Sequence, residues 1–231
     1  MRSSRLLVLG ALLAPVPAAA QSASPVPSVR VSATGEVRVK PDEGWVDLGV
    51  ETQGASAQAA AEANASTMQR VIEALVRAGV PRDQVETQGF NVFPEYDGRP
   101  DGGEPRLRGY RVSNVVTAHV ADVSRVGSVI DAGLGAGANR VNGVRFGVRE
   151  AARYREQALQ EAVRRGRAEA QVLAGALGVP LGPVLEASTA TTPVQPYPVM
   201  MRMEAAQADT PIQPGEQTIT ATVTLVYRLG A

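Results

Sequence analysis

Residues 45–96 decide the fold, because they read as strand, helix and strand in succession. The stretch is WVDLGVETQ at 45–53, SAQAAAEANASTMQRVIEALVRAGVP at 56–81 and QVETQGFNVFPEY at 84–96. Apolar residues of the middle segment recur at the spacing of an amphipathic helix, which we predict over residues 56–78. Ser56 is placed to cap this helix, and Gly79 and Pro81 are placed to end it. The stretch therefore predicts a β-α-β unit.

The residues before this unit predict a further strand. Residues 29–40, VRVSATGEVRVK, alternate apolar and polar side chains with the period of two that is typical of a half-buried strand. Residues 41–44, PDEG, have the composition of a tight turn. We therefore predict that residues 29–40 and 45–53 form an antiparallel hairpin.

A second β-α-β pattern follows the first. A strand is predicted at residues 107–121, then a short helix capped by Asp122 or Ser124, then a strand at 141–149. The glycine-rich residues 133–137, GLGAG, follow the short helix and are interpreted as its C-terminal end, because a phosphate-binding loop would have to open a helix. The two units predict a sheet with two pseudo-repeated halves.

The C-terminal part contains the longest predicted helix, residues 150–177, and two more strands at 184–191 and 217–229. One face of this helix is apolar and consists of Leu159, Val163, Gly166, Ala170, Leu173 and Leu177. We expect the small residues Ala158, Ala162, Gly166, Ala168 and Ala170 to let the helix lie close against the sheet. A proline-rich loop without periodicity covers residues 193–216. Together these segments predict an α+β fold: a largely antiparallel sheet with two βαβ-like units and a long helix packed on one face, in a single domain over residues 29–231.

The N-terminus has the features of a secretory signal peptide. Residues 1–20 combine Arg2 and Arg5 with a short apolar run and end in three alanines, which favours cleavage near Ala20. We expect residues 21–28 to be a linker. No later apolar stretch is long enough to span a bilayer, so the mature chain is expected in the periplasm, with association to the outer membrane left open.

Composition argues against several function classes. The chain contains no cysteine, which excludes disulfides and thiolate chemistry. Its 23 basic and 23 acidic residues balance, so nothing indicates a nucleic-acid partner. Because His119 is the only histidine, a histidine cluster for zinc or iron cannot form within one chain. We expect no cofactor, no metal and no catalytic residue.

Two groups of polar residues need a separate interpretation. His119 is interpreted as an ordinary strand histidine, although a triad with Ser113 or Ser124 stays open until the geometry is known. The predicted hairpin tip at residues 97–105 is interpreted as solvated, with a weak surface cation site as the alternative. Its acidic residues are Asp97, Asp101 and Glu104, whose spacing does not fit a calcium loop.

The 193–216 loop holds an apolar stretch, PYPVMMRM, at residues 196–203. Methionine side chains adapt their packing easily, and an uncovered apolar patch often marks a contact surface. The loop could dock on a neighbouring subunit, touch a membrane surface peripherally, capture Cu(I), or fold over its own core. The candidate contact residues are Tyr197, Met200, Met201 and Met203.

Six short stretches, in this order and spacing, resemble the bacterial SIMPL-domain family of exported proteins. They are VSATGEVRVKPD at 31–42, VETQGFNVFPEY at 85–96, GYRVSN at 109–114, VNGVRF at 141–146, LAGALG at 173–178 and PGEQTITATV at 214–223. The resemblance implies an α+β domain of the periplasm or envelope, linked to envelope or oxidative stress, host immune recognition or self-assembly. It implies no reaction and no catalytic residue.

We therefore expect a non-enzymatic, exported protein that acts by self-assembly or by protein contacts in the cell envelope, in connection with stress. A homo-oligomer is expected, because sheet edges and apolar patches are what neighbouring subunits can pair with. Other envelope proteins are further candidate partners. The alternatives are a small-ligand or metal-binding periplasmic module, and a hydrolase whose site is not visible as a motif.

Overall fold

The computed structural model describes residues 26–97, 105–190 and 210–230. The predicted signal peptide, most of the linker, most of the hairpin tip and most of the 193–216 loop lie outside these residues. The elements in chain order are β1 (Ser28–Val39), β2 (Glu43–Gly54), α1 (Ala57–Arg77), η1 (Arg82–Gln84), β3 (Val85–Asp97), β4 (Arg106–Val120), η2 (Val123–Arg125), α2 (Val126–Gly135), β5 (Arg140–Gly147), α3 (Ala151–Ala176), β6 (Leu181–Ala190) and β7 (Gln217–Leu229).

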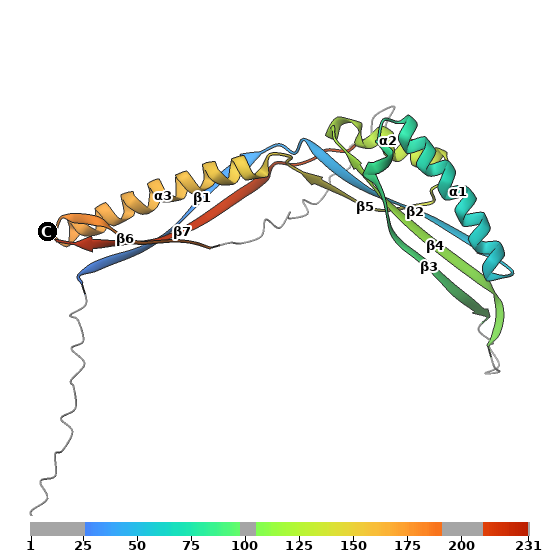
Figure 1. Cartoon of the computed structure of the whole chain (residues 1–231), viewed down its shortest axis with the longest axis horizontal. Helices are drawn as coiled ribbons and strands as arrows, with labels where there is room; N and C mark the ends of the chain where they lie inside the picture. Colours follow the sequence, from blue (N-terminus) through green and yellow to red (C-terminus); the bar gives the residue numbers. More distant parts are fainter. Residues whose placement is uncertain (1–25, 98–104, 191–209, 231) are drawn as a thin grey trace, which may run out of the picture.

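The strands form two antiparallel sheets, one of three strands in the order β1-β7-β6 and one of four in the order β3-β4-β2-β5. Figure 1 shows the chain as an arch, with the three α-helices on its outer side and the sheets on its inner side. The predicted α+β fold with antiparallel pairing and a long helix is confirmed. The strands divide between two sheets, however, where one sheet was predicted.

The predicted hairpin between residues 29–40 and 45–53 is wrong. β1 pairs along its whole length with β7, so that Val31 lies opposite Leu225, while β2 pairs with β4 and β5 in the other sheet. The intervening residues lead from one sheet to the other, and the amide of Asp42 donates to the carbonyl of Gly147 at 3.0 Å. An alternating pattern identifies a strand but not its partner, and here the alternating C-terminal strand is the partner.

The two predicted β-α-β units are confirmed and share the four-stranded sheet. In β2-α1-β3 and in β4-α2-β5 the two strands run parallel, with one strand of the other unit between them. This is the split β-α-β arrangement of ferredoxin-like sheets. Helix α1 begins as predicted, because the hydroxyl of Ser56 accepts from the amide of Ala59 at 3.2 Å.

The larger apolar core lies between α1, α2 and one face of the four-stranded sheet. Its buried residues are Val46, Leu48, Val50, Met68, Val71, Leu75, Val80, Val116, Ala118, Val120, Val126, Val129, Ile130 and Ala138. None of the described helices lies on the opposite face of this sheet (Figure 1). Within the described residues, no helix is both long enough and apolar enough to cross a membrane.

Helix α3 packs on the three-stranded sheet through small residues, as predicted for Ala158, Ala162, Gly166 and Ala170 but not for the exposed Ala168. Its buried residues are Ala158, Ala162, Gly166, Ala170 and Ala174. The predicted Gly166 and Ala170 belong to this face, whereas Val163, Leu173 and Leu177 are exposed. The helix approaches the sheet so closely that a Cβ built at Gly35 of β1 would lie 1.9 Å from the carbonyl oxygen of Ala158. Small side chains fit such an approach, whereas Val163, Leu173 and Leu177 face outward and Leu159 is partly buried against this core.

Candidate functional site

Polar side chains gather on the face of the four-stranded sheet that no helix covers. Because side chains alternate along a strand, the core residues of β2 and β4 are interleaved with residues that point to this open face. The register places Trp45 opposite His119 and Asp47 opposite Thr117. The four strands therefore bring together acids, bases and aromatic rings that are far apart in the sequence.

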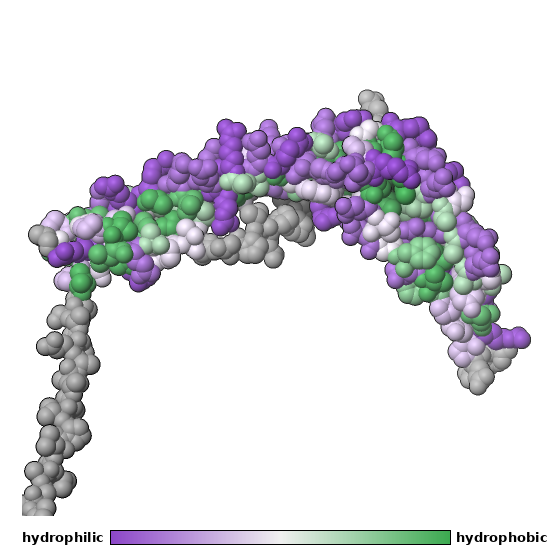
Figure 2. Space-filling view, viewed as in Figure 1, coloured by the Kyte–Doolittle hydropathy of each residue, from purple (hydrophilic) through white to green (hydrophobic). Residues whose placement is uncertain are grey.

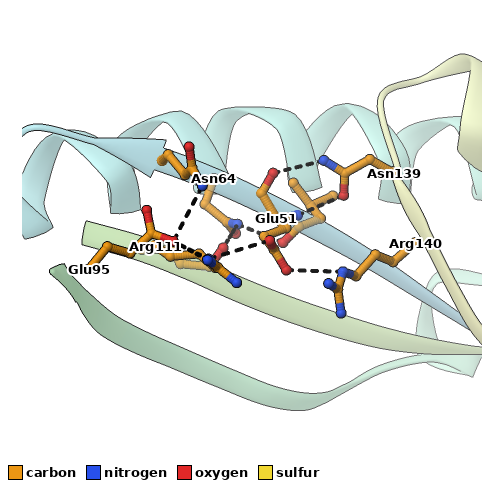
Figure 3. A network of polar contacts seen from close by, with 9 residues as sticks. Glu51, Asn64, Glu95, Arg111, Asn139 and Arg140 are labelled. Atoms are coloured by element: carbon orange, nitrogen blue, oxygen red, sulfur yellow. Dashed lines mark hydrogen bonds and ion pairs between the residues drawn. The ribbon is translucent and has the colours of Figure 1, made fainter. Parts of the chain in front are cut away.

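A network of ion pairs centred on Arg111 occupies one part of this face, as Figure 3 shows. The Nε of Arg111 donates to Glu95 Oε1 at 2.6 Å and lies 3.6 Å from Glu51 Oε1. The Nε of Arg140 lies 3.0 Å from Glu51 Oε2. The side-chain amide of Asn139 pairs with the backbone of Glu51, donating to its carbonyl at 2.8 Å and accepting from its amide at 2.9 Å.

The carboxylates and guanidiniums of this network pair with one another. The hydrogen bond and the negative charge of Glu95 raise the pKa of the Arg111 guanidinium above its ordinary value. The carboxylate oxygens of Glu51 are shared between two arginines. These side chains come from β2, β3, β4 and β5, so their ion pairs connect all four strands of the sheet.

Asn64 ties helix α1 to the sheet beneath this network. It is fully buried, and its amide nitrogen donates to the carbonyls of Val50 at 2.9 Å and Val112 at 3.4 Å. The Oδ1 atoms of Asn64 and Asn114 are buried without a hydrogen-bond partner among the described residues. A buried amide in this position fixes α1 to two strands at once.

His119 stands at the other end of the open face, held between two side chains. Its Nε2 is 2.9 Å from Glu43 Oε2, and its Nδ1 is 2.8 Å from Gln84 Oε1. Its ring stacks on the indole of Trp45, with centroids 5.1 Å apart and planes inclined by 25°. Arg149 reaches the same Glu43 carboxylate at 3.9 Å. The imidazole is thus fixed on three sides.

Asp47 lies between the Arg111 network and His119 with its neighbours. It accepts a hydrogen bond of 2.5 Å from the hydroxyl of Thr117 and one of 3.3 Å from the guanidinium of Arg145. Thr117 is itself buried. Asp47 is therefore already paired with a hydroxyl and a guanidinium.

A small cavity with a volume of about 220 Å³ opens beside His119. Its lining residues are Glu43, Trp45, Gln84, Glu86, Thr117 and His119. A larger and shallower hollow of about 360 Å³ lies between α1 and α2. Its lining is alanine and glycine apart from Arg77. Only the smaller cavity brings convergent polar groups and aromatic rings together, which is the usual composition of a ligand site.

The described residues do not assemble a metal centre or a catalytic triad. No group of three or more His, Asp or Glu residues among them is placed to hold a metal ion. The ring nitrogens of His119 face Glu43 and Gln84, not Ser113. The hydroxyl of Ser124 donates to Asp122 at 2.7 Å. The triad considered from the sequence is therefore not formed.

The structure places the remaining sequence candidates as follows. Tyr197, Met200, Met201 and Met203 lie outside the described residues, as do Asp101 and Glu104. Asp97 ends β3 and lies 3.8 Å from Arg108, an exposed ion pair. The glycine-rich residues 133–137 end α2, with Gly137 at φ +115°, which agrees with their interpretation as a helix end.

Sequence reasoning identified His119 but not its surroundings. Glu43 and Gln84 are 76 and 35 residues away from it in the chain. Trp45 was assigned to a strand that was paired with the wrong partner. Had the pairing of β2 with β4 been known, the register would have placed Trp45 beside His119.

Comparison with known proteins gives the chain a family. Residues 29–227 match the SIMPL family model, described as a protein of unknown function (DUF541). The matched residues run from β1 to β7 and include strands of both sheets. The chain belongs to the SIMPL family.

The relatives include named and uncharacterized proteins. The 26 kDa periplasmic immunogenic protein of Brucella melitensis biotype 1 is 30% identical over 201 residues, covering 85% of this chain and 80% of that protein. The uncharacterized protein YggE of Edwardsiella ictaluri is 32% identical over 175 residues, covering 74% and 72%. YggE of Escherichia coli K12 is 25% identical over 178 residues, covering 77% and 72%. None of these names describes a catalytic activity.

Proposed function

We propose that this chain is exported to the periplasm and acts there through contacts with other protein chains, including copies of itself, and not by catalysis. Residues 1–20, with their basic start and short apolar run, support export. The name of the Brucella relative places that protein in the periplasm, which supports the same location here. A role in envelope stress is the further expectation that the family resemblance adds.

The observation that carries this proposal is the edge strand β3. It is 13 residues long and pairs only with β4 among the described residues, so its outer edge presents unpaired backbone groups. Phe90, Phe93 and Tyr96 are all about half exposed, at 51%, 52% and 58%. A long edge strand with exposed apolar side chains is a site where another chain can add a strand.

The far end of the arch carries a second apolar surface. Val172 and Leu177 of α3 and its C-terminal turn are 72% and 64% exposed, and Val184 and Leu185 of the edge strand β6 are each 50% exposed. Figure 2 shows apolar residues at the surface of both ends of the arch. Two separate exposed apolar surfaces on one chain favour assembly into larger structures, because each copy can contact two neighbouring copies.

The test is the mass of the exported chain in solution, measured by light scattering during size-exclusion chromatography. Residues 21–231 are expected to elute at a multiple of the mass of a single chain. Replacing Phe90 and Phe93 together with lysine places charge on both faces of β3, which is how natural edge strands prevent pairing. We expect this variant to have a smaller mass than the unchanged protein.

The matched control replaces Val76 and Leu134 together with lysine, which adds the same two charges at exposed apolar positions of α1 and α2, away from both surfaces. If the control lowers the mass while the β3 variant does not, the edge-strand argument is wrong. A single-chain mass for the unchanged protein at all concentrations would contradict self-assembly. Circular dichroism of each variant establishes that it is folded.

A further inference from the structure

We propose that the cavity beside His119 binds a small organic cation, a primary amine that also carries a hydrogen-bond acceptor. This inference does not rest on the proposed assembly. The cavity lies on the open face where η1 and the strands β2, β3 and β4 meet, and its volume is about 220 Å³. Sites for drug-sized ligands span roughly 300–1,000 Å³, so the ligand must be smaller than that.

The charge of the cavity favours a cation. Glu86 lines it and has no hydrogen bond or ion pair with any described residue, so both carboxylate oxygens are free to accept. Glu43 contributes a second carboxylate. The nearby arginines point elsewhere: Arg145 pairs with Asp47, and Arg149 reaches Glu43 from outside the lining at 3.9 Å. An anion would meet two carboxylates, whereas an ammonium group gains charge-assisted hydrogen bonds from Glu86.

The other lining groups define the rest of the ligand. With Nδ1 of His119 donating to Gln84 Oε1 at 2.8 Å, the Nε2 of Gln84 is a donor without a partner among the described residues. A ligand acceptor, such as a carbonyl or hydroxyl oxygen, would satisfy this donor. The stacked rings of Trp45 and His119 form an aromatic wall against which a short hydrocarbon part can pack. A metal ion is a poorer fit, since three suitable side chains do not converge here among the described residues.

The chain supplies its own reporters for a binding experiment. Trp45 is the only tryptophan and His119 the only histidine in the sequence, and both line the cavity. Indole fluorescence and the imidazole proton resonances therefore report on this cavity alone. The probe is alaninamide, which carries an ammonium group and a carbonyl acceptor. Propionamide, the same molecule without the ammonium group, is the matched ligand control.

Alaninamide is expected to change the Trp45 emission and the His119 resonances along one saturable curve, with a Kd on the order of 1 mM, as befits so small a ligand. Added salt should weaken the binding of alaninamide, because salt screens an exposed contact between charges. Propionamide should cause no saturable change. Equal responses to the two molecules, or no saturation with alaninamide, would overturn the proposal.

Glu86→Gln keeps the shape of the side chain and removes its charge. We expect it to weaken alaninamide binding about tenfold or more, the usual effect of losing a charge-assisted hydrogen bond. Glu36→Gln is the control, because Glu36 is also exposed on a strand and also lacks a described partner, but lies in the other sheet. Unchanged binding in Glu86→Gln, or an equal loss in both variants, would refute the site. The oligomer mass is measured in parallel, so that failure of assembly and failure of binding are read separately.

Discussion

Replacing Gly35 with alanine should force α3 away from the three-stranded sheet. A Cβ built at Gly35 would lie 1.9 Å from the carbonyl oxygen of Ala158 and 2.6 Å from the amide nitrogen of Ala162. Both atoms belong to the helix backbone, so no rotation of a side chain can relieve the contact. The helix would have to retreat by about 1.5 Å to restore an ordinary contact of 3.4 Å.

The retreat sets the expected loss of stability. Ala158, Ala162 and Ala170 are fully buried against the sheet and would lose part of their packing. A buried methyl group contributes about 0.8 kcal/mol, and overpacking costs about 1–3 kcal/mol where side chains can adjust. Because backbone atoms cannot adjust in this way, we take the upper end, a loss of about 3 kcal/mol in the free energy of unfolding. For a chain of this length that corresponds to roughly 6–12 °C in Tm.

Urea unfolding followed by circular dichroism measures this loss, since α3 is the longest helix. Gly175→Ala in the same helix is the control, because nothing lies within 4 Å of its added Cβ. It should stabilise the protein by up to about 1 kcal/mol through helix propensity. A Gly35→Ala protein within about 0.5 kcal/mol of the unchanged protein would refute the packing argument, since distant surface changes have effects of that size.

Three further predictions follow from the contacts. Asn64→Asp should cost about 3–5 kcal/mol at neutral pH, because it buries a carboxylate against two carbonyls, and the loss should shrink in acid; Asn142→Asp, at an exposed position of β5 without a hydrogen bond to a described residue, should show neither effect. Hydrogen bonds from Arg164 and Arg165 lower the pKa of Glu161. At pH values above the ordinary pKa of 4.5, Glu161→Gln should therefore cause a small decrease in Tm, and it should have no effect once the pH falls below the lowered pKa. Amide hydrogen exchange should be faster in β1 and β7 than in β2 and β4, because the core beneath α3 is smaller; equal rates would contradict this.

Sequence patterns were sufficient where the physics is local. The apolar spacing of residues 56–78, with Ser56 before and Gly79 after, predicted α1 almost to its observed bounds, Ala57–Arg77. The alternation in residues 217–229 predicted β7 with one buried and one exposed face. In both cases the signal lies within one segment, so no knowledge of the rest of the chain was needed.

The predictions failed where the answer depends on a distant segment. β1 was paired with its neighbour in sequence, although its partner β7 begins more than 170 residues later. The small residues of α3 were expected to allow a close approach to the sheet, but Val163, Leu173 and Leu177 were placed on the same face, and they are exposed. A hydrophobic pattern does not contain the distance between a helix and a sheet, and that distance decides which side chains fit.

The candidate site shows the same limit. His119 was visible as the only histidine, but its meaning depends on Glu43, Gln84 and Trp45, which the four-stranded register brings to it. The methionine loop, which the sequence singled out, lies outside the described residues and stays a prediction. The pairing of strands that are distant in the sequence, and not the residue type, therefore determines whether a histidine is an ordinary strand residue or lines a cavity.

The distribution of ion-pair partners over the inner side of the arch supports the proposal that this chain acts through contacts with other protein chains. Glu51, Glu95 and Asp47 are each bound by an arginine, so most acids of the open face are already neutralised. Glu86, which lies beside them on β3, is not. The same strand holds the exposed Phe90 and Phe93. Unpaired backbone and uncovered apolar surface thus coincide on β3, and a partner chain that covers this strand would satisfy both, while the Glu86 carboxylate is the group that we assign to the ligand of the cavity.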